Sequence, residues 1–131
     1  MSALVLDTNA YSRALRGDPA AVEPLRSASE IHIPLMVLGE LLAGFAAGSR
    51  AERNRRDLAE FMSAPRVSLM RPDERTAHRY AGVVTALRES GRPIPTNDVW
   101  IAALALQAGM PLLTFDAHFG WVPGLSLARS R

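Results

Sequence analysis

Two aspartates directly follow short apolar runs that are expected to be buried strands. Asp7 comes after Ala-Leu-Val-Leu at 3–6, and Asp116 comes after Leu-Leu-Thr-Phe at 112–115. Apolar runs of this length without polar alternation are typical of strands covered on both faces. Because ligands of parallel α/β sheets gather at the carboxyl ends of the strands, we expect both carboxylates at one edge of a sheet.

Two further acids are expected in helices. Asp98 precedes an uncharged segment, 99–108, which Gly109 ends and which must be central in the core because it is apolar on all sides. Glu40 lies within a helix expected at 35–47, among small and apolar neighbours and without an arginine three or four residues away. A carboxylate on such a face is costly unless a cation lies opposite it. The alternative is a helix edge at which Glu40 reaches solvent.

The aspartates also have ordinary structural explanations when each is taken alone. Asp7 fits the N-cap of the helix that follows it. Asp98 fits the first turn of a helix, where the helix dipole favours negative charge, with Thr96 or Asn97 as the cap. Asp116 fits a turn.

The four acids matter as a set. Four carboxylates at one place repel one another, which raises their pKa values and destabilises the fold. A divalent cation removes this conflict, and ligands that are all oxygen atoms indicate Mg²⁺ or Mn²⁺ rather than zinc. We therefore predict Asp7, Glu40, Asp98 and Asp116 as metal ligands and catalytic residues. Such a site suits phosphodiester hydrolysis by a metal-activated water.

Short polar side chains stand close to these acids in the sequence. Thr8, Asn9, Ser12 and Thr114 carry hydroxyl or amide groups that can orient carboxylates or a metal-bound water. We predict that they support the site in this way.

The three histidines contribute less to this prediction. His32 is expected in a strand and His78 on the polar side of a helix, so both are interpreted as structural. His118 is interpreted as a turn residue close to the site, with contact to the substrate as the alternative.

Composition excludes several kinds of chemistry. The chain has 131 residues with no cysteine and no lysine, so all 15 basic residues are arginines. Disulfides, zinc–thiolate sites, thiol nucleophiles and lysine-dependent mechanisms are therefore excluded. Arginine binds phosphate with two hydrogen bonds, so an acid-rich pocket within an arginine-rich surface is compatible with a nucleic-acid substrate.

Four arginines cluster around a helix expected at 51–62. The alternation of these arginines with acids favours a solvated helix face over a surface that tracks a nucleic-acid backbone. The residues are Arg50, Arg53, Arg55 and Arg56 with Glu52, Asp57 and Glu60.

The sequence shows no pattern for export or membrane insertion. Its N-terminus lacks the basic and apolar segments of a secretory signal. The longest uncharged run, 99–115, is interrupted by Gln107, Gly109 and Pro111 and is short for a membrane span. We expect a cytoplasmic protein that does not contact membranes.

Short strands alternate with helices along the whole chain. Strands are expected at 3–6, 31–33, 67–69 and 112–115, with a short closing segment at 125–127. Helices are expected from Thr8 to about Arg16, and at 20–27, 35–47, 51–62, 73–90 and 99–108. This alternation predicts an α/β fold, a single domain over 1–131, with a short, mainly parallel sheet flanked by helices on both faces.

Four motifs occur in a fixed order from Leu4 to Leu127. They are Asp7-Thr8-Asn9, Glu40, Asn97-Asp98 followed by Ile101-Ala102-Ala103, and Thr114-x-Asp116-x-His118-Phe119. Together they resemble the PIN-domain ribonucleases, and more narrowly the VapC-type toxins of bacterial type II toxin–antitoxin modules. The resemblance implies a PIN-like domain.

The resemblance also implies function. It implies an Mg²⁺- or Mn²⁺-dependent endoribonuclease toxin, a homodimer, and a cognate antitoxin that wraps the toxin and blocks its site. In the expected mechanism, Asp7 and Asp98 hold the principal metal, and Asp116 and Glu40 complete the site or hold a second ion. Attack by water on the RNA phosphorus leaves 5′-phosphate and 3′-hydroxyl ends. The RNA target and the number of ions stay open.

Three other functions share sequence features with this one. Haloacid-dehalogenase-type phosphatases and response-regulator receivers also place an aspartate after the first strand, but both need a lysine. The phosphatases also need a second aspartate where Asn9 stands. The remaining alternative is a PIN domain that has lost catalysis and acts by binding its partner, and the four intact acids argue against it.

Overall fold

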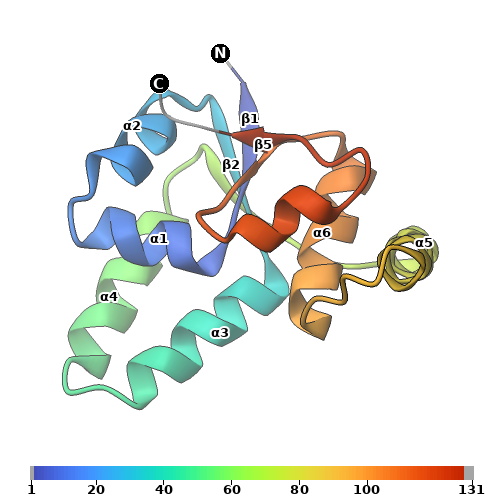
Figure 1. Ribbon diagram of the computed structural model, residues 1–131. Helices are drawn as coiled ribbons and strands as arrows, with labels where there is room; N and C mark the ends of the chain where they lie inside the picture. The colour runs from blue at the N-terminus through green and yellow to red at the C-terminus, as the bar shows by residue number, and fades with distance from the viewer. Residues whose placement is uncertain (1, 129–131) are drawn as a thin grey trace.

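The computed structural model describes residues 2–128 and contains one five-stranded sheet in the order β3-β2-β1-β4-β5 (Figure 1). Every pairing between the described strands is parallel, so the sheet predicted to be mainly parallel is wholly so. The strands are β1 Ala3–Leu6, β2 Glu30–Pro34, β3 Val67–Met70, β4 Leu112–Leu113 and β5 Leu127–Ala128.

The helices match the predicted segments to within a few residues. None of the described helices combines the length and the low charge that a bilayer crossing requires. They are α1 Thr8–Leu15, α2 Pro19–Ser27, α3 Leu35–Ala46, α4 Ala51–Met62, α5 Glu74–Glu89 and α6 Thr96–Ala108, followed by the 3₁₀ helix η1 Ala117–Trp121.

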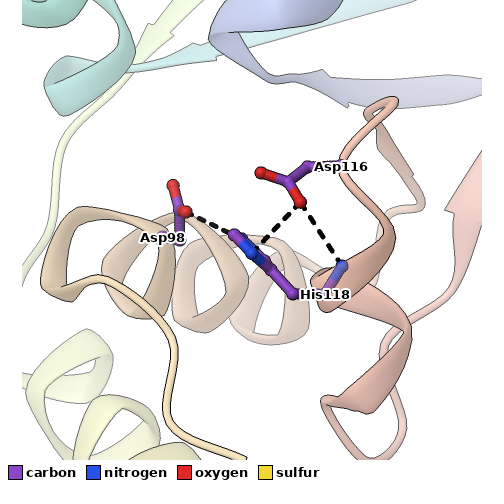
Figure 2. Close-up of side chains that lie close together, drawn as sticks. All are labelled: Asp98, Asp116 and His118. Carbon is purple, nitrogen blue, oxygen red and sulfur yellow. Dashed lines mark hydrogen bonds and ion pairs between the residues drawn. The ribbon is translucent and has the colours of Figure 1, made fainter.

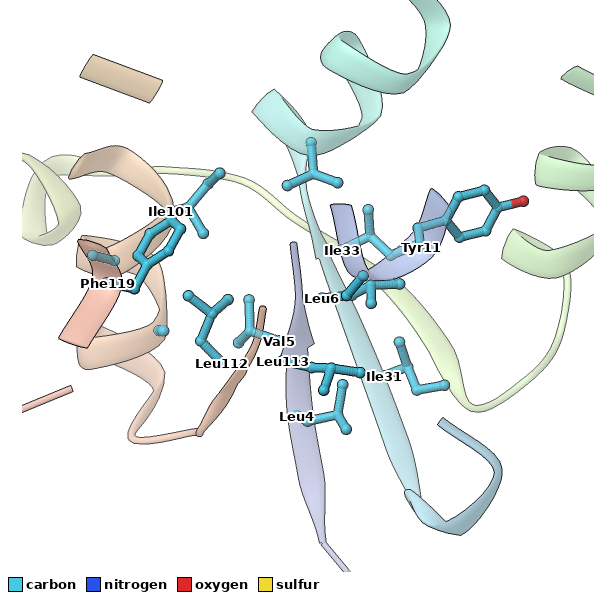
Figure 3. Packing of buried hydrophobic residues seen from close by; sticks show 14 of the residues in the cluster. Leu4, Val5, Leu6, Tyr11, Ile31, Ile33, Ile101, Leu112, Leu113 and Phe119 are labelled. Carbon is cyan, nitrogen blue, oxygen red and sulfur yellow. The ribbon is translucent and has the colours of Figure 1, made fainter. Parts of the chain in front are cut away.

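Helices cover both faces of the sheet. The chain moves from β1 to β3 through α1–α4 and then returns to β4 through α5 and α6. Because parallel crossovers are right-handed, the two directions place these helix groups on opposite faces. Successive side chains of β1 pack against opposite helix layers. Leu6 lies on the side of Tyr11 in α1 (Figure 3). Val5 lies on the side of Ile101 in α6. The predicted α/β architecture is confirmed.

Helix α6 is the central helix that its composition predicts. Val99 and every residue from Ile101 to Ala105 are buried. Gly109 ends the helix at φ 67°, a left-handed conformation that glycine adopts without strain. The prediction that Thr96 or Asn97 caps this helix is wrong. Pro95 occupies the capping position, and Thr96 is already helical.

Strand β4 is shorter than predicted. Its ladder stops at Leu113, although the apolar run continues to Phe115. The Phe115 backbone N–H donates to the side-chain oxygen of Asn9 at 3.1 Å instead of to a neighbouring strand. The side chain of Asn9 thus ends the ladder and fixes the turn that carries Asp116.

Candidate active site

Asp7 lies at the carboxyl end of the central strand. Its side chain is buried, and its backbone N–H donates to the carbonyl of Leu113 at 3.0 Å. One carboxylate oxygen accepts from the Thr8 backbone N–H at 2.8 Å, and the other accepts from the Thr114 hydroxyl at 2.6 Å. Asp7 is also the N-cap of α1, so the capping role and a place in the site are compatible.

Burial raises the pKa of Asp7 from its ordinary 3.8 to about 6. The hydrogen bonds from Thr114 and Thr8 oppose this rise, while the charges of Asp98 and Glu40 add to it. The free protein therefore holds this carboxyl in surroundings that disfavour its charge. A cation placed beside Asp7 would remove that penalty.

Glu40 reaches the site from the first half of α3 and is half-buried. Its partners are neutral: the Thr8 hydroxyl donates to Oε1 at 2.5 Å, and the Asn97 amide donates to Oε2 at 3.4 Å. Among the described residues, no arginine forms an ion pair with Glu40. The apolar helix face around it is also more open than predicted, because Ala43 and Gly44 are exposed.

Asp98 and Asp116 meet through a histidine (Figure 2). His118 Nε2 lies 2.8 Å from the Asp98 carboxylate, and Nδ1 lies 3.1 Å from the Asp116 carboxylate. The interpretation of His118 as a plain turn residue was therefore wrong. Burial raises the pKa of Asp98, the contact with His118 opposes the rise, and the charges of Glu40 and Asp116 add to it.

The spacing between Asp116 and His118 in the sequence could have predicted that the histidine contacts an acid of the site. Asp116 caps η1 and accepts from the His118 backbone N–H at 3.4 Å, so the histidine follows its cap by two residues. A capping carboxylate faces the first turn of the helix that it caps. The spacing Asp-x-His therefore brings the imidazole near the acid, although it gives no indication of Asp98.

The structure brings all four predicted acids to one open cavity of about 540 Å³. Each comes from a separate element: the end of β1, helix α3, the first turn of α6, and the turn after β4. Thr114 is buried behind Asp7. The wall is formed by Asp7, Thr8, Asn9, Ser12, Arg13, Arg16, Glu40, Asp98 and Asp116.

The family model described as PIN domain matches residues 4–125. The chain belongs to the PIN-domain family. Ribonuclease VapC4 of Mycobacterium tuberculosis is 32% identical to this PIN domain over 95 residues, which are 72% of this chain and 73% of that protein.

Solved structures agree in fold with this PIN domain. The crystal structure of VapBC2 from Rickettsia felis bound to a DNA fragment from their promoter has a TM-score of 0.85 at 26% identity and covers 98% of this chain and 99% of that chain. VapBC-5 from M. tuberculosis, a member of the VapBC family of toxin–antitoxin systems, has a TM-score of 0.69 at 27% identity and covers 96% and 94%. The resemblance read from the four motifs is confirmed.

Two arginines on the cavity wall of the PIN domain were not predicted. Arg13 and Arg16 extend from α1 to the wall that carries the acids. Arg13 is directed elsewhere: its guanidinium lies 3.5 Å from Asp18 and 4.3 Å from the ring centre of Phe115. Across residues 2–128, no arginine forms an ion pair with any of the four acids. Guanidinium groups therefore do not neutralise the cluster.

The donor atoms of the site fit a hard divalent cation. Ligand atoms of Asp98, Asp116 and His118 lie within 4.8 Å of one another. Asp7 and Glu40 add carboxylate oxygens to the wall of the same cavity. Oxygen-rich sites of this kind suit Mg²⁺, Ca²⁺ or Mn²⁺. The raised pKa values of Asp7 and Asp98 are the electrostatic sign of acids that a cation would stabilise.

Proposed function

We propose that this PIN domain is a metal-dependent endoribonuclease and the toxin of a type II toxin–antitoxin module. One observation carries the proposal: four carboxylates from four separate elements line one open cavity, and the arginines on its wall do not neutralise them. The curated relative named as a ribonuclease and the VapBC structures support the same function.

Asp7 and Asp98 would hold the principal Mg²⁺ or Mn²⁺, and Asp116 and Glu40 would complete the site or hold a second ion. The bound cation supplies charge neutralisation at the phosphodiester and lowers the pKa of a coordinated water. Hydrogen bonds from neighbouring residues orient the carboxylates of the cluster. Thr114 and the Thr8 backbone hold the two oxygens of Asp7, the Thr8 hydroxyl and Asn97 hold Glu40, and Asn9 holds the turn before Asp116.

His118 has a positioning role in this proposal. Its two ring nitrogens lie against carboxylates from α6 and from the turn after β4. The imidazole therefore holds two acids of the cluster in a defined relation. Ser12 lies on the wall of the cavity without such a contact among the described hydrogen bonds, and its supporting role stays a prediction.

The test is RNA cleavage by the purified protein with Mg²⁺ and with EDTA. Asp98→Asn keeps the shape of the side chain and removes its charge, so we expect cleavage to fall by ~10²-fold or more, as when other groups that stabilise transition-state charge are removed. Glu89→Gln removes an exposed acid at the end of α5 and serves as the matched control with unchanged cleavage.

The ends of the products test the chemistry. Attack by water gives 5′-phosphate and 3′-hydroxyl ends, whereas a 2′,3′-cyclic phosphate would contradict the proposal. Equal and negligible activity of the native protein and Asp98→Asn across transfer, ribosomal and messenger RNA would instead favour a PIN domain that acts by binding alone.

A cognate antitoxin is the proposed protein partner, supported by similarity to VapBC complexes. Helix α3 exposes Leu35 and Leu42, two turns apart, and such apolar side chains are suited to contact with another chain. The homodimer, the single domain over 1–131 and the cytoplasmic location remain predictions.

A further inference from the structure

A second cavity adjoins the acidic one. It has a volume of about 550 Å³, and Ser12 and Arg16 line both cavities. The two cavities are therefore neighbours on the surface of α1. The residues that line the second cavity come from α1, the end of α3, and the start of α4 with the residues next to it. Helix α3 packs against both α1 and α4, and all three are visible in Figure 1.

Arginines dominate the charge of this second cavity. Arg16, Arg50 and Arg53 line it, and Asp57 is the one acid among its lining residues. In the described part of the chain, none of these three arginines forms an ion pair. We call Arg16, Arg50 and Arg53 the arginine groove.

The structure separates arginines that the sequence groups together. All four arginines are exposed, but Arg50 and Arg53 line the second cavity whereas Arg55 and Arg56 do not. Arg56 lies 3.6 Å from Glu52 on the same helix. The interpretation of a solvated helix face therefore agrees with the exposure of all four arginines, and only Arg50 and Arg53 also line the cavity.

The negative charge of the acid cluster opposes the binding of RNA, which is itself a polyanion. Four carboxylates repel the phosphates next to the bond that is cut, and one divalent cation would offset only two of the four charges. Cationic side chains beside the cluster would therefore add binding energy for the strand. Guanidinium groups bind phosphate oxygens with two hydrogen bonds and release counterions when they do so. The arginine groove begins at the cavity wall that carries the acids, at Arg16, and leads away from it.

We infer that the arginine groove binds backbone phosphates of the RNA strand on one side of the bond that is cut. The inference rests on the proposed function, since it assigns part of the path of the RNA substrate. The groove contacts phosphates and not base edges, so it anchors the strand without reading its sequence. Sequence or shape preference then has to come from other surfaces.

Binding of a labelled single-stranded RNA of mixed sequence to full-length Asp98→Asn tests the inference. Asp98→Asn is used so that the RNA stays intact, and affinity is measured over a range of NaCl concentrations at fixed Mg²⁺. In this background, Arg50→Gln with Arg53→Gln should lower the slope of log affinity against log salt by ~1.4, since each phosphate contact of a single strand contributes ~0.7.

Arg55→Gln with Arg56→Gln is the matched control. It removes the same charge from the same region of α4, so it corrects for net charge and helix content. We expect the native slope for this pair, and also for Arg50→Lys with Arg53→Lys, which keeps the charge. Thermal unfolding by circular dichroism checks that every variant is folded.

Equal slopes for the Arg50/Arg53 and Arg55/Arg56 glutamine pairs would overturn the inference. The proposed function fails in a different way: the protein with native acids would not cleave RNA, whatever the slopes. In a cleaving protein the Arg50/Arg53 glutamine pair should raise KM and leave kcat unchanged, because it removes binding that substrate and transition state share equally.

Discussion

The carboxyl group of Asp7 is the residue whose surroundings most oppose its charge. Its pKa is about 6 in the folded protein against an ordinary 3.8, so between these values the folded state binds more protons than the unfolded state. Stability of the metal-free protein therefore falls as pH rises through this window. A difference of about two pH units is worth ~3 kcal/mol at 1.36 kcal/mol per unit.

Asp7→Asn should remove this penalty. We expect the metal-free variant to match the native protein near pH 4 and to exceed it at pH 7.5 by up to ~3 kcal/mol, because an amide has no charge to bury. Urea unfolding in EDTA at the two pH values measures the difference.

Asp73→Asn provides a control of opposite sign. Asp73 caps α5, and hydrogen bonds from the Thr76 backbone and the Gln107 side chain lower its pKa. Its contribution is present above the ordinary pKa and is lost as pH falls, so this variant should lose stability at pH 7.5. An Asp7→Asn protein that is no more stable than the native one at pH 7.5 would show that the carboxyl is better solvated than its burial indicates.

The sequence identifies the acids but not all of their neighbours. Asp7 and Asp116 follow apolar runs, so their place at one sheet edge follows from pattern alone. Arg16 and the contact between His118 and Asp98 depend on how α1, α6 and η1 approach one another. Such contacts are set by packing, which residue spacing within one element does not contain.

At the scale of elements, apolar pattern and turn residues predicted most boundaries. The first strand was placed at 3–6 and α4 at 51–62, as observed. The errors occur where side chains replace backbone bonds. Asn9 ends β4 early, and Pro95 takes the capping position that was expected for Thr96 or Asn97.

Substitution of two glycines by alanine should change the free energy of unfolding in opposite directions. Gly109 has φ 67° after α6, while Gly82 lies within α5, and a methyl group added at either meets no atom within 4 Å. Gly109→Ala should destabilise the fold by ~1 kcal/mol, the least expected for forcing a side chain into the left-handed region. Gly82→Ala should stabilise it by ~0.4–1 kcal/mol through helix propensity and a less flexible unfolded chain.

Chemical unfolding of both glycine variants under one condition measures the pair. Because neither methyl group meets a neighbour, the opposite signs arise from backbone conformation alone. Destabilisation of similar size in both variants would contradict this explanation and point to tight packing around α5.

At the scale of the whole molecule, the acid cluster links cation binding to folding. The site exists only when four separate elements are assembled, so a cation binds the folded state and not the unfolded one. Mg²⁺ should therefore raise Tm with increasing concentration, by an amount that grows as the logarithm of concentration above Kd. Differential scanning fluorimetry at pH 7.5 measures this dependence.

Ionic strength supplies the control for this thermal shift. NaCl at equal ionic strength screens repulsion among the acids but does not bind at one site. We expect a smaller shift with NaCl, a reduced Mg²⁺ shift in Asp98→Asn, and a reduced shift below pH 6, where Asp7 must first lose its proton. Equal shifts with the two salts would indicate screening alone.

The order of strands in the sheet has a consequence for how the protein is made. The central strand β1 is synthesised before the other strands of the sheet, but its neighbour β4 and the acid that follows it come after all six α-helices in the sequence. Asp116 and His118 can therefore reach Asp98 only after the polypeptide through η1 has left the ribosome. A nuclease built in this way has no complete site while the segments before β4 are being synthesised.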